Sequence, residues 1–521
     1  MNINTSTGGL SFKMDWTSHN LLIRLVVRLK AEARTHRSSW RIRAYVMSVA
    51  ILNGCQVPRP GTSYTNFKAP RSGASAIDHL QPQASTPVPA VTATTSTPTV
   101  SSPPVTPLAP YTAPNIWTWM SGSSTYGMGA GVQGATDIAA ASNVPSGRSS
   151  AMSWNDGRGN LWLFGGNAQV GCLNDFWKYD GTNWVRLSGS SNIGNQPGAY
   201  GVKGIGASTN IPRSRYGGTT WTDSAGNLWL FGGIFLKDFG LLGGLNDLWK
   251  FDGSNWTWVS GSTAADQSGV YGTQGVASTD NMPGARYGAA SWRDRSGNLW
   301  LFGGTTLPYY RHLLSDLWMF DGSMWVWISG SNSIDQPSVY GPQGEASPKN
   351  IPGGRSGLVS WTDSAGRFWL YGGPPAFEPN GWTTLWRFDG TAWTWVAGNN
   401  PDAFVRDHTQ GYGDIQQAPF SGEGAVSWID KGDNLWLSPG GNNQVWKFDG
   451  REWTFVSGNA PNSIEGVEQH VKYGTLGVPA PDNLPPARSG AVGWTDSNWN
   501  VWMFGGSYNG IYFNDLWRTG F

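Results

Sequence analysis

Residues Arg215–Gly233 read RYGGTTWTDSAGNLWLFGG, and after a variable loop Asn246–Ser262 read NDLWKFDGSNWTWVSGS. This unit recurs six times, and a double glycine marks each copy at spacings of 65 to 71 residues. The first glycines of the pairs are Gly165, Gly232, Gly303, Gly372, Gly440 and Gly505. A unit that recurs at one period predicts a repeat architecture before any other fold.

Each copy contains four short runs typical of β-strands. The first ends in Trp-x-Asp, the second is NLWLFGG, the third is DLWKF and the fourth is WTWVS. Turn-like DSAG joins the first to the second, and DGSN joins the third to the fourth. The sequence therefore predicts an all-β, six-bladed propeller with four antiparallel strands in each blade.

The pattern R-x-G, an apolar run, Gly-Gly, a variable stretch, N-D-x-W-x-[FY]-D and a later Trp resembles the Kelch repeat. The resemblance covers residues 115–521 and implies a Kelch-like propeller. The unit is longer than the roughly 50 residues of a Kelch repeat. The additional residues follow the fourth strand.

The two ends of the repeat region are complementary halves of one unit. The last copy ends after its third strand, at NDLWRTGF, while Asn115–Ser123 (NIWTWMSGS) form a fourth strand without a preceding third. The sequence predicts that the N-terminal strand completes the sixth blade beside Leu516–Arg518. Such closure removes two exposed sheet edges.

Composition limits the classes of function. The 521 residues carry a formal net charge of +1, which gives no field for nucleic acid. The high content of Gly (72) and Trp (32) is typical of short strands and turns. The two cysteines, Cys55 and Cys172, are too few for a disulfide framework or a zinc site. We expect no nucleic-acid partner, no cofactor and no metal, and a monomer.

Residues 1–55 have the layout of an export leader. Arg34–Arg43 are strongly basic, and the apolar run Ala44–Gly54 precedes Cys55. Leu52–Cys55 (LNGC) resembles the bacterial lipobox, in which the cysteine is lipidated after cleavage. Plain secretion and a chance apolar run are the alternatives. Residues 56–114 then become rich in Pro, Thr and Ser, which predicts a disordered tether and membrane contact through the lipid alone.

Residues found in every blade are interpreted as scaffold. The second strands each carry a tryptophan, expected to pack blade against blade: Trp162, Trp229, Trp300, Trp369, Trp436 and Trp502. The segment after the fourth strand repeats as VYGTQGVASTDNMPGAR (Val270–Arg286), so we expect it to be a packed element. Asp-Gly pairs such as Asp252-Gly253 are expected to form turns.

The loops divide between two faces because the strands alternate in direction. The links between the second and third strands are long and differ most between blades, which favours binding on that face. We expect a protein or glycan surface there, with packing on neighbouring loops as the alternative. The variable loops are Ile234–Gly244, Thr305–Leu314, Pro374–Trp382 and Ser507–Phe513.

Five arginines precede the first strand of five blades: Arg148, Arg215, Arg286, Arg355 and Arg488. If the first strand is innermost, as in Kelch-like propellers, these side chains ring the channel mouth and attract a carboxylate or phosphate. Bracing of neighbouring blades is the other interpretation. Bacterial sialic-acid mutarotases resemble this architecture, with arginines and an acidic residue at an axial pocket. That resemblance implies Glu423, placed at the same position of blade five, as a catalytic general base.

The histidines of the sequence do not predict a metal site. Three histidines of the repeat region, His312, His408 and His470, lie in different blades at no ligand spacing. The resulting interpretation is an exported, lipid-tethered Kelch-like propeller that binds a protein or glycan through its long-loop face. The alternative is a mutarotase or epimerase that acts on an acidic sugar at the arginines.

Overall fold

The computed structural model describes residues 5–6, 9–10, 116–125, 129–237, 240–307, 312–373, 383–398, 419, 424–458 and 471–520. The chain divides into two compact units, Met1–Val100 and Ser101–Phe521. In the first unit, β1 (Thr5–Ser6) pairs with β2 (Gly9–Leu10). The predicted leader, Cys55 and the tether lie outside the described residues.

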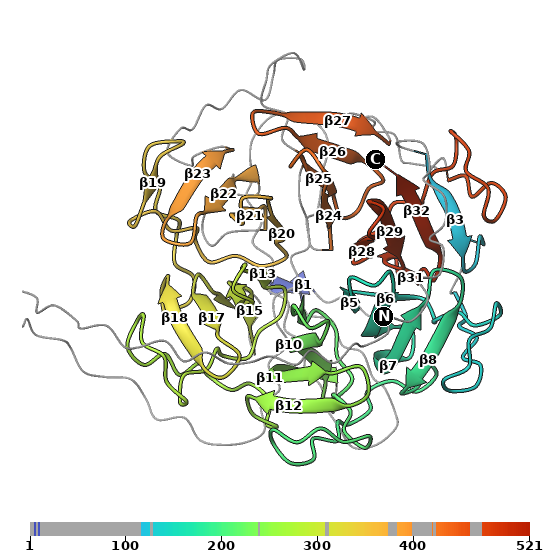
Figure 1. The fold of residues 1–521 in the computed structure, drawn as a ribbon, viewed down its shortest axis with the longest axis horizontal. Coiled ribbons are helices and arrows are strands. Elements are labelled where there is room, and N and C mark those ends of the chain that lie inside the picture. Colours follow the sequence, from blue (N-terminus) through green and yellow to red (C-terminus); the bar gives the residue numbers. More distant parts are fainter. Residues whose placement is uncertain are drawn as a thin grey trace, which may run out of the picture. The chain divides into compact units, whose positions relative to one another are not determined.

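The second unit is a ring of six antiparallel sheets, which confirms the predicted fold class (Figure 1). Blade 1 contains β5 (Met152–Asn155), β6 (Leu161–Ala168), β7 (Gly171–Tyr179) and β8 (Trp184–Ser188), and β4 (Arg148–Ser149) extends it. Blade 2 contains β9 (Thr219–Thr222), β10 (Leu228–Leu236), β11 (Leu242–Phe251) and β12 (Trp256–Ser260). Blade 3 contains β13 (Ala290–Arg293), β14 (Leu299–Phe302), β17 (Leu317–Phe320) and β18 (Trp325–Ser329).

The remaining blades repeat this order. Blade 4 contains β20 (Val359–Thr362), β21 (Phe368–Tyr371), β22 (Leu385–Phe388) and β23 (Trp393–Ala397), with β19 (Ala346–Ser347) on its outer edge. Blade 5 contains β24 (Val426–Ile429), β25 (Leu435–Ser438), β26 (Val445–Phe448) and β27 (Trp453–Ser457). Blade 6 contains β28 (Val492–Thr495), β29 (Asn500–Phe504), β32 (Leu516–Gly520) and β3 (Thr118–Ser121).

The sixth blade closes as predicted. Strand β3 pairs antiparallel with β32, and Thr118 faces Arg518 while Trp119 faces Trp517. In Figure 1 the two strands lie side by side, although some 400 residues separate them in the chain. Asn483, in the link that leads into blade 6, donates a hydrogen bond of 2.9 Å to the Trp117 carbonyl. The ring is thus held shut by backbone pairing and by a side chain.

The core lies between the blades. Six buried clusters each combine side chains from two neighbouring blades. The second-strand tryptophans are only 4 to 8% exposed, which confirms their predicted packing role. Their indoles donate to the aspartate of the preceding hairpin, as Trp229 does to Asp223 at 2.9 Å. Large aromatic side chains that are buried in this way each remove a large apolar area from water.

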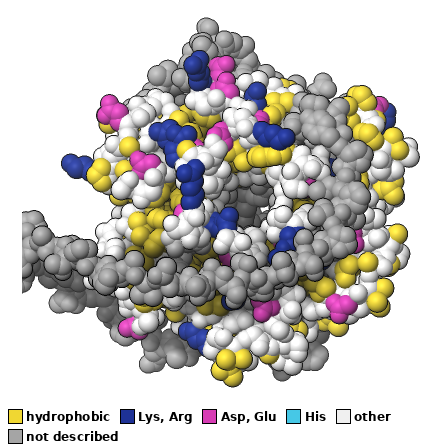
Figure 2. All heavy atoms as spheres, in the orientation of Figure 1, with side chains coloured by type: hydrophobic (Ala, Val, Ile, Leu, Met, Phe, Trp, Pro, Cys, Tyr) yellow, Lys and Arg dark blue, Asp and Glu magenta, His cyan; other side chains and the backbone are white. Residues whose placement is uncertain are grey.

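The first strands form the inner wall of the ring, since each contacts the first strands of both neighbouring blades. Their burial alternates, so the first and third residues pack between blades and the second and fourth face the axis. Hydroxyls at the second position bind the carbonyl of the preceding blade, as Thr220 does to Ser153 at 3.0 Å and Ser291 to Thr220 at 3.1 Å. Figure 2 shows the ring hollowed at its centre.

The links after the fourth strands are packed elements, as predicted. Asn281 donates to the Val276 and Trp325 carbonyls, so the link that leads into blade 3 crosses the outer strand of that blade. Equivalent asparagines, Asn143, Asn210, Asn350 and Asn483, bind Trp184, Trp256, Trp393 and Trp117 in the same way. A link laid along an outer strand covers an edge that would otherwise pair with another chain.

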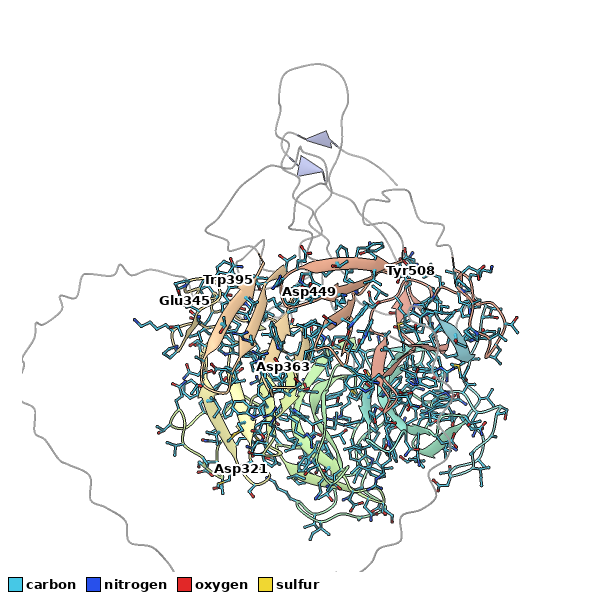
Figure 3. All side chains as sticks on the ribbon, turned by 45° about the horizontal axis from the view of Figure 1, so that its top comes forward. Asp321, Glu345, Asp363, Trp395, Asp449 and Tyr508 are labelled. Atoms are coloured by element: carbon cyan, nitrogen blue, oxygen red, sulfur yellow. The ribbon has the colours of Figure 1, made fainter. Side chains whose placement is uncertain are left out.

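Short turns on one face contrast with hairpins on the other. In Figure 3, Asp363 marks the inner turn of blade 4, while Asp321 and Asp449 mark the outer turns of blades 3 and 5. The outer turns begin with Asp-Gly pairs, as predicted. On the opposite face, blades 1 and 2 differ from the prediction, since β6 and β10 continue beyond the double glycine. In blade 2 the pairing of β10 with β11 shifts register between Phe231 and Gly233. Gly232 and Gly233 have positive φ angles of 64° and 97° there, a conformation that favours glycine.

Candidate functional site

Four of the five predicted arginines form buried ion pairs inside their own blades. Arg215 donates from Nη1 to Asp247 Oδ1 at 2.6 Å and from Nη2 to Asp247 Oδ2 at 2.7 Å. The same two-pronged pair joins Arg148 to Asp175, Arg286 to Asp316 and Arg488 to Asp515. These arginines are 0 to 4% exposed and their aspartates 0%.

Further hydrogen bonds occupy the other donors and acceptors of these ion pairs, as the pair in blade 2 shows. In blade 2, Arg215 donates further to the Arg213 and Gly232 carbonyls, at 3.0 and 2.9 Å. Asp247 accepts two more bonds, from the Tyr200 hydroxyl at 2.7 Å and the Trp249 indole at 2.8 Å. The cluster ties β10 and β11, next to the double glycine, to the link that enters the blade. Such a network rigidifies a buried region when every member is satisfied.

The charges in this cluster are fixed at physiological pH. Burial alone raises the pKa of Asp175, but the Arg148 guanidinium, with bonds from Ser191 and Trp177, lowers it below the ordinary value. Burial lowers the pKa of Arg215, and Asp247 reverses the effect and raises it. These groups therefore stay charged at neutral pH, and neither is suited to exchange protons with a substrate.

The fifth arginine has a different partner. Arg355 is 0% exposed and donates to the Thr384 hydroxyl at 2.8 Å and the Ser338 hydroxyl at 2.8 Å. The guanidiniums of all five arginines thus brace their own blades, which differs from the bracing between neighbouring blades that the sequence analysis gave as an interpretation. Binding of an anionic ligand by Arg148, Arg215, Arg286, Arg355 and Arg488 stays a prediction.

The position assigned to Glu423 needs a correction in register. Arg215 precedes the start of β9 (Thr219) by four residues, and β24 starts at Val426, so the equivalent position in blade 5 is Gly422. Gly490 N also donates to the Gly424 carbonyl, as Gly288 N does to Gly217, which aligns Gly424 with Gly217. Glu423 lies outside the described residues, and its catalytic role stays a prediction.

Hairpins of unequal length rise from the long-loop face. In blade 1, β6 and β7 meet at a turn whose Val170 is 46% exposed, and in blade 2 the hairpin of β10 and β11 carries Leu241, 64% exposed. The sequence analysis did not single out the blade 1 loop, although the five residues between Gly165 and Gly171 indicate a tight turn. In blade 3, β15 (Thr305–Thr306) and β16 (His312–Leu313) make a shorter ladder.

The blade 6 loop packs on its neighbour. Strands β30 (Ser507–Tyr508) and β31 (Ile511–Tyr512) form a two-residue ladder. The Tyr512 hydroxyl accepts a 3.0 Å bond from Asn167 of blade 1. This loop follows the alternative that the sequence analysis gave, packing on a neighbouring hairpin. The predicted loop Pro374–Trp382 lies outside the described residues.

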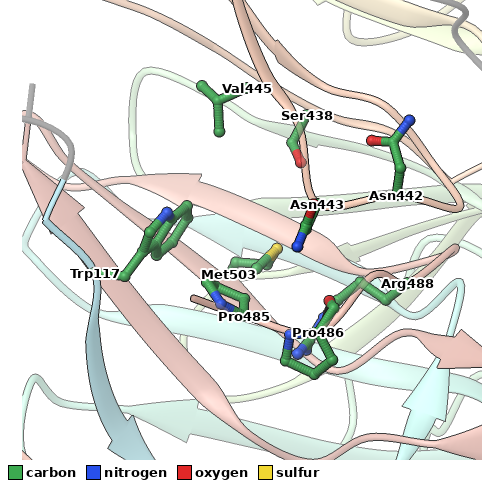
Figure 4. A pocket seen from close by; sticks show the side chains of 9 residues that line it. All are labelled: Trp117, Ser438, Asn442, Asn443, Val445, Pro485, Pro486, Arg488 and Met503. Carbon is green, nitrogen blue, oxygen red and sulfur yellow. Dashed lines mark hydrogen bonds between the residues drawn. The ribbon is translucent and has the colours of Figure 1, made fainter. Parts of the chain in front are cut away.

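A small cavity at the junction of blades 5 and 6 is too small for a ligand. Its volume is about 10 Å³, which holds at most one water molecule. Figure 4 shows Trp117, Asn443 and Met503 around it, with Arg488 beside Pro486. The cavity therefore belongs to the packing around the closing strand.

The described ranges contain neither a metal-ligand cluster nor a membrane-spanning helix. There, no group of three or more His, Cys, Asp or Glu side chains is placed to hold a metal ion. His312 Nδ1 lies 3.3 Å from Asp335 Oδ2, while His408 and His470 lie outside those ranges. No helix among the described residues has the length and apolar character needed to cross a bilayer.

Similarity to known proteins is distant. No protein-family model matches the chain, and no curated protein matches its sequence. Among solved structures, "Structure of YjhT" is similar with a TM-score of 0.44 and 13% identity, over 72% of this chain and 95% of that chain. A likeness this distant carries no argument about the site. The propeller assignment depends on the strand pairing of this chain.

Proposed function

We propose that the chain is an exported, lipid-tethered propeller of the Kelch type that binds a protein or glycan through its long-loop face. One observation carries the binding role: six blades share one scaffold, yet the hairpins described in blades 1, 2, 3 and 6 differ in length on this face. Variable loops on a rigid scaffold are where binding usually resides.

The hairpin tips supply suitable contact groups. Val170 and Leu241 expose apolar side chains at the ends of two-stranded ladders that hold them in place. The blade 2 ladder is braced near its tip, since the Arg213 guanidinium lies 4.1 Å from the Phe235 ring centroid and Lys237 pairs with Asp266. Rigid presentation lowers the conformational entropy that binding costs.

A glycan array probed with the full chain tests this function. We expect saturable binding that weakens at least about tenfold in Leu241→Asp, since a charge replaces an apolar contact. Val276→Asp is the matched control, because Val276 is 53% exposed but lies in a link outside the hairpins. Binding that falls equally in both variants, or no saturable binding to glycans or to purified envelope proteins, contradicts the proposal.

Export and lipidation form a separate part of the proposal. Cys55 follows an apolar run and precedes a Pro-, Thr- and Ser-rich stretch, the order expected for a lipid anchor, a tether and a folded domain. Incorporation of a labelled fatty acid that is lost in Cys55→Ser, with release of the protein from membranes, supports it. Label retained in Cys55→Ser contradicts the assignment of this cysteine.

The enzymatic alternative receives no further support from the described geometry. A mutarotase or epimerase would need arginine donors that face a substrate, whereas the donors of the four Asp-paired arginines are directed to aspartates and carbonyls. A direct assay of sugar anomer exchange in the wild type and in Glu423→Gln decides this alternative.

A further inference from the structure

Arg293 breaks the repeat on the inner wall of the ring. It is the fourth residue of β13, a position that faces the axis, and it is exposed. The equivalent residues in the other blades are Asn155, Thr222, Thr362, Ile429 and Thr495. None of these is charged, so blade 3 alone places a charge at this level of the axial wall. Since the other five blades fold without a charge at this position, the fold does not require Arg293, which points to another role for it.

The Arg293 side chain borders a hollow at the axial mouth on the short-turn face. The hollow has a volume of about 490 Å³, and the inner turns of blades 6, 1 and 2 line the rest of it. Figure 2 shows Lys and Arg side chains gathered around the central opening of the ring. A volume of this size is typical of small-molecule sites.

The aspartates of the hollow are committed to their own turns. Asp223 accepts bonds from the Ala225 and Asn227 amides and from the Asn227 and Trp229 side chains, all at 2.8 to 2.9 Å. Asp156 and Asp496 hold their turns in the same way. Their charges are offset by several donors each, and these bonds fill the acceptor sites of each carboxylate.

Two guanidiniums of the hollow are not used by the fold. Among the described residues, no hydrogen bond or ion pair involves the side chain of Arg293 or of Arg158. Arg158 Nη2 lies 3.8 Å from the point that a Cβ on Gly226 would occupy, which places the Arg158 guanidinium against the inner turn of blade 2. By contrast Arg295, two residues after Arg293, donates to the Ser364 carbonyl of blade 4 and so braces two turns. Arg293 and Arg158 therefore differ from the structural arginines of this protein.

We propose that this axial mouth binds a small hydroxylated molecule that carries an oxyanion, such as a sugar phosphate. The Arg293 fork holds the oxyanion, since a guanidinium matches phosphate and carboxylate geometry with two parallel bonds. Arg158 adds a second positive charge. The Ser224 and Ser497 hydroxyls meet the ligand hydroxyls. This site lies on the face opposite the hairpins of the proposed binding function, and each is independent of the other.

Calorimetric titration of the full chain tests the site with three probes: glucose 6-phosphate, glucose and inorganic phosphate. We expect glucose 6-phosphate to bind most tightly and to weaken with added salt. Arg293→Ala should weaken it about 10- to 100-fold, the loss expected for a charge-assisted pair, and Arg293→Lys should weaken it less. Glucuronate, as a fourth probe, tells whether the site prefers phosphate or carboxylate.

A matched control separates the site from general charge effects. Arg451→Ala removes an exposed guanidinium from an outer turn on the same face and should leave the affinity unchanged. Because Arg293 is exposed and no described residue pairs with it, the near-UV circular dichroism of Arg293→Ala should match the wild type. Equal affinity in Arg293→Ala and wild type, equal affinity for glucose and glucose 6-phosphate, or no oxyanion binding below about 10 mM overturns the proposal.

Discussion

Replacement of one buried aspartate should show how much the arginine clamps contribute to stability. Asp247→Ala removes the acceptor of four hydrogen bonds, two from Arg215 and one each from Tyr200 and Trp249. It also leaves the guanidinium charge of a 0% exposed side chain without its counter-ion. Breaking a buried pair by removing one partner costs about 3–5 kcal/mol. That is a large part of the roughly 5–15 kcal/mol that separates native from unfolded proteins.

Urea unfolding followed by tryptophan fluorescence measures this loss. Asp252→Ala is the control, because Asp252 is an exposed turn acceptor for two backbone amides only, and its removal should cost about 1 kcal/mol or less. The double variant Arg215→Met/Asp247→Leu should recover most of the stability, since apolar replacement of a buried pair is often neutral. Equal unfolding midpoints for Asp247→Ala and Asp252→Ala would refute the clamp argument.

Three other predictions concern closure, acid and backbone conformation. Deletion of residues 116–121 should expose the edge of β32 and promote aggregation seen by light scattering, and unchanged solubility and melting would contradict six-bladed closure. Burial raises the pKa of Asp223, but hydrogen bonds from Trp229 and Asn227 outweigh it and hold the pKa below its ordinary 3.8. The ionised carboxylate therefore stabilises the fold fully above that value, and this stabilisation is lost as pH falls through the folded pKa. The urea midpoint should drop below about pH 4 and not between pH 5 and 7. Gly288→Ala should lower the free energy of unfolding by at least about 2 kcal/mol, because φ is 65° and the new Cβ would lie 3.1 Å from the Gly357 amide nitrogen. Gly253→Ala should lower it by about 1 kcal/mol, because φ is 100° but nothing lies within 4 Å of the new Cβ. Equal melting temperatures of the two variants would contradict this difference.

The sequence predicts the ring well because its signals are local and repeated. The Asp-Gly turns, the second-strand tryptophans and the displaced strand at 115–123 each state their role within a few residues. The Arg215–Asp247 pair is different, since 31 residues of turns and strands separate its members. An Arg and an Asp occur together at these two positions in four blades, and this co-occurrence was a usable signal. Blade 5 has Gly422 and Gln444 at the same two positions, so the loss of both charges together was a second signal.

The site proposed at the axial mouth was not predicted from the sequence, for a related reason. The sequence analysis assigned the link between the first and second strands only to a turn, and the difference at Arg293 is a single residue. It becomes visible only when the first strands are aligned by their tryptophans, with Arg293 directly after Trp292. Even then, the sequence does not show which residues of a strand face the axis. That depends on the pleat of the wall and on the packing of neighbouring blades.

The pairing of β3 with β32 also sets an order of events during synthesis. Blades 1 to 5 can associate with their neighbours as they appear, but the seam has to wait until residue 518 has left the ribosome. At about 5–20 residues per second, the intervening 400 residues take roughly 20–80 s. During that interval Thr118–Ser121 has no native partner strand, so the ring stays open until β32 has been synthesised.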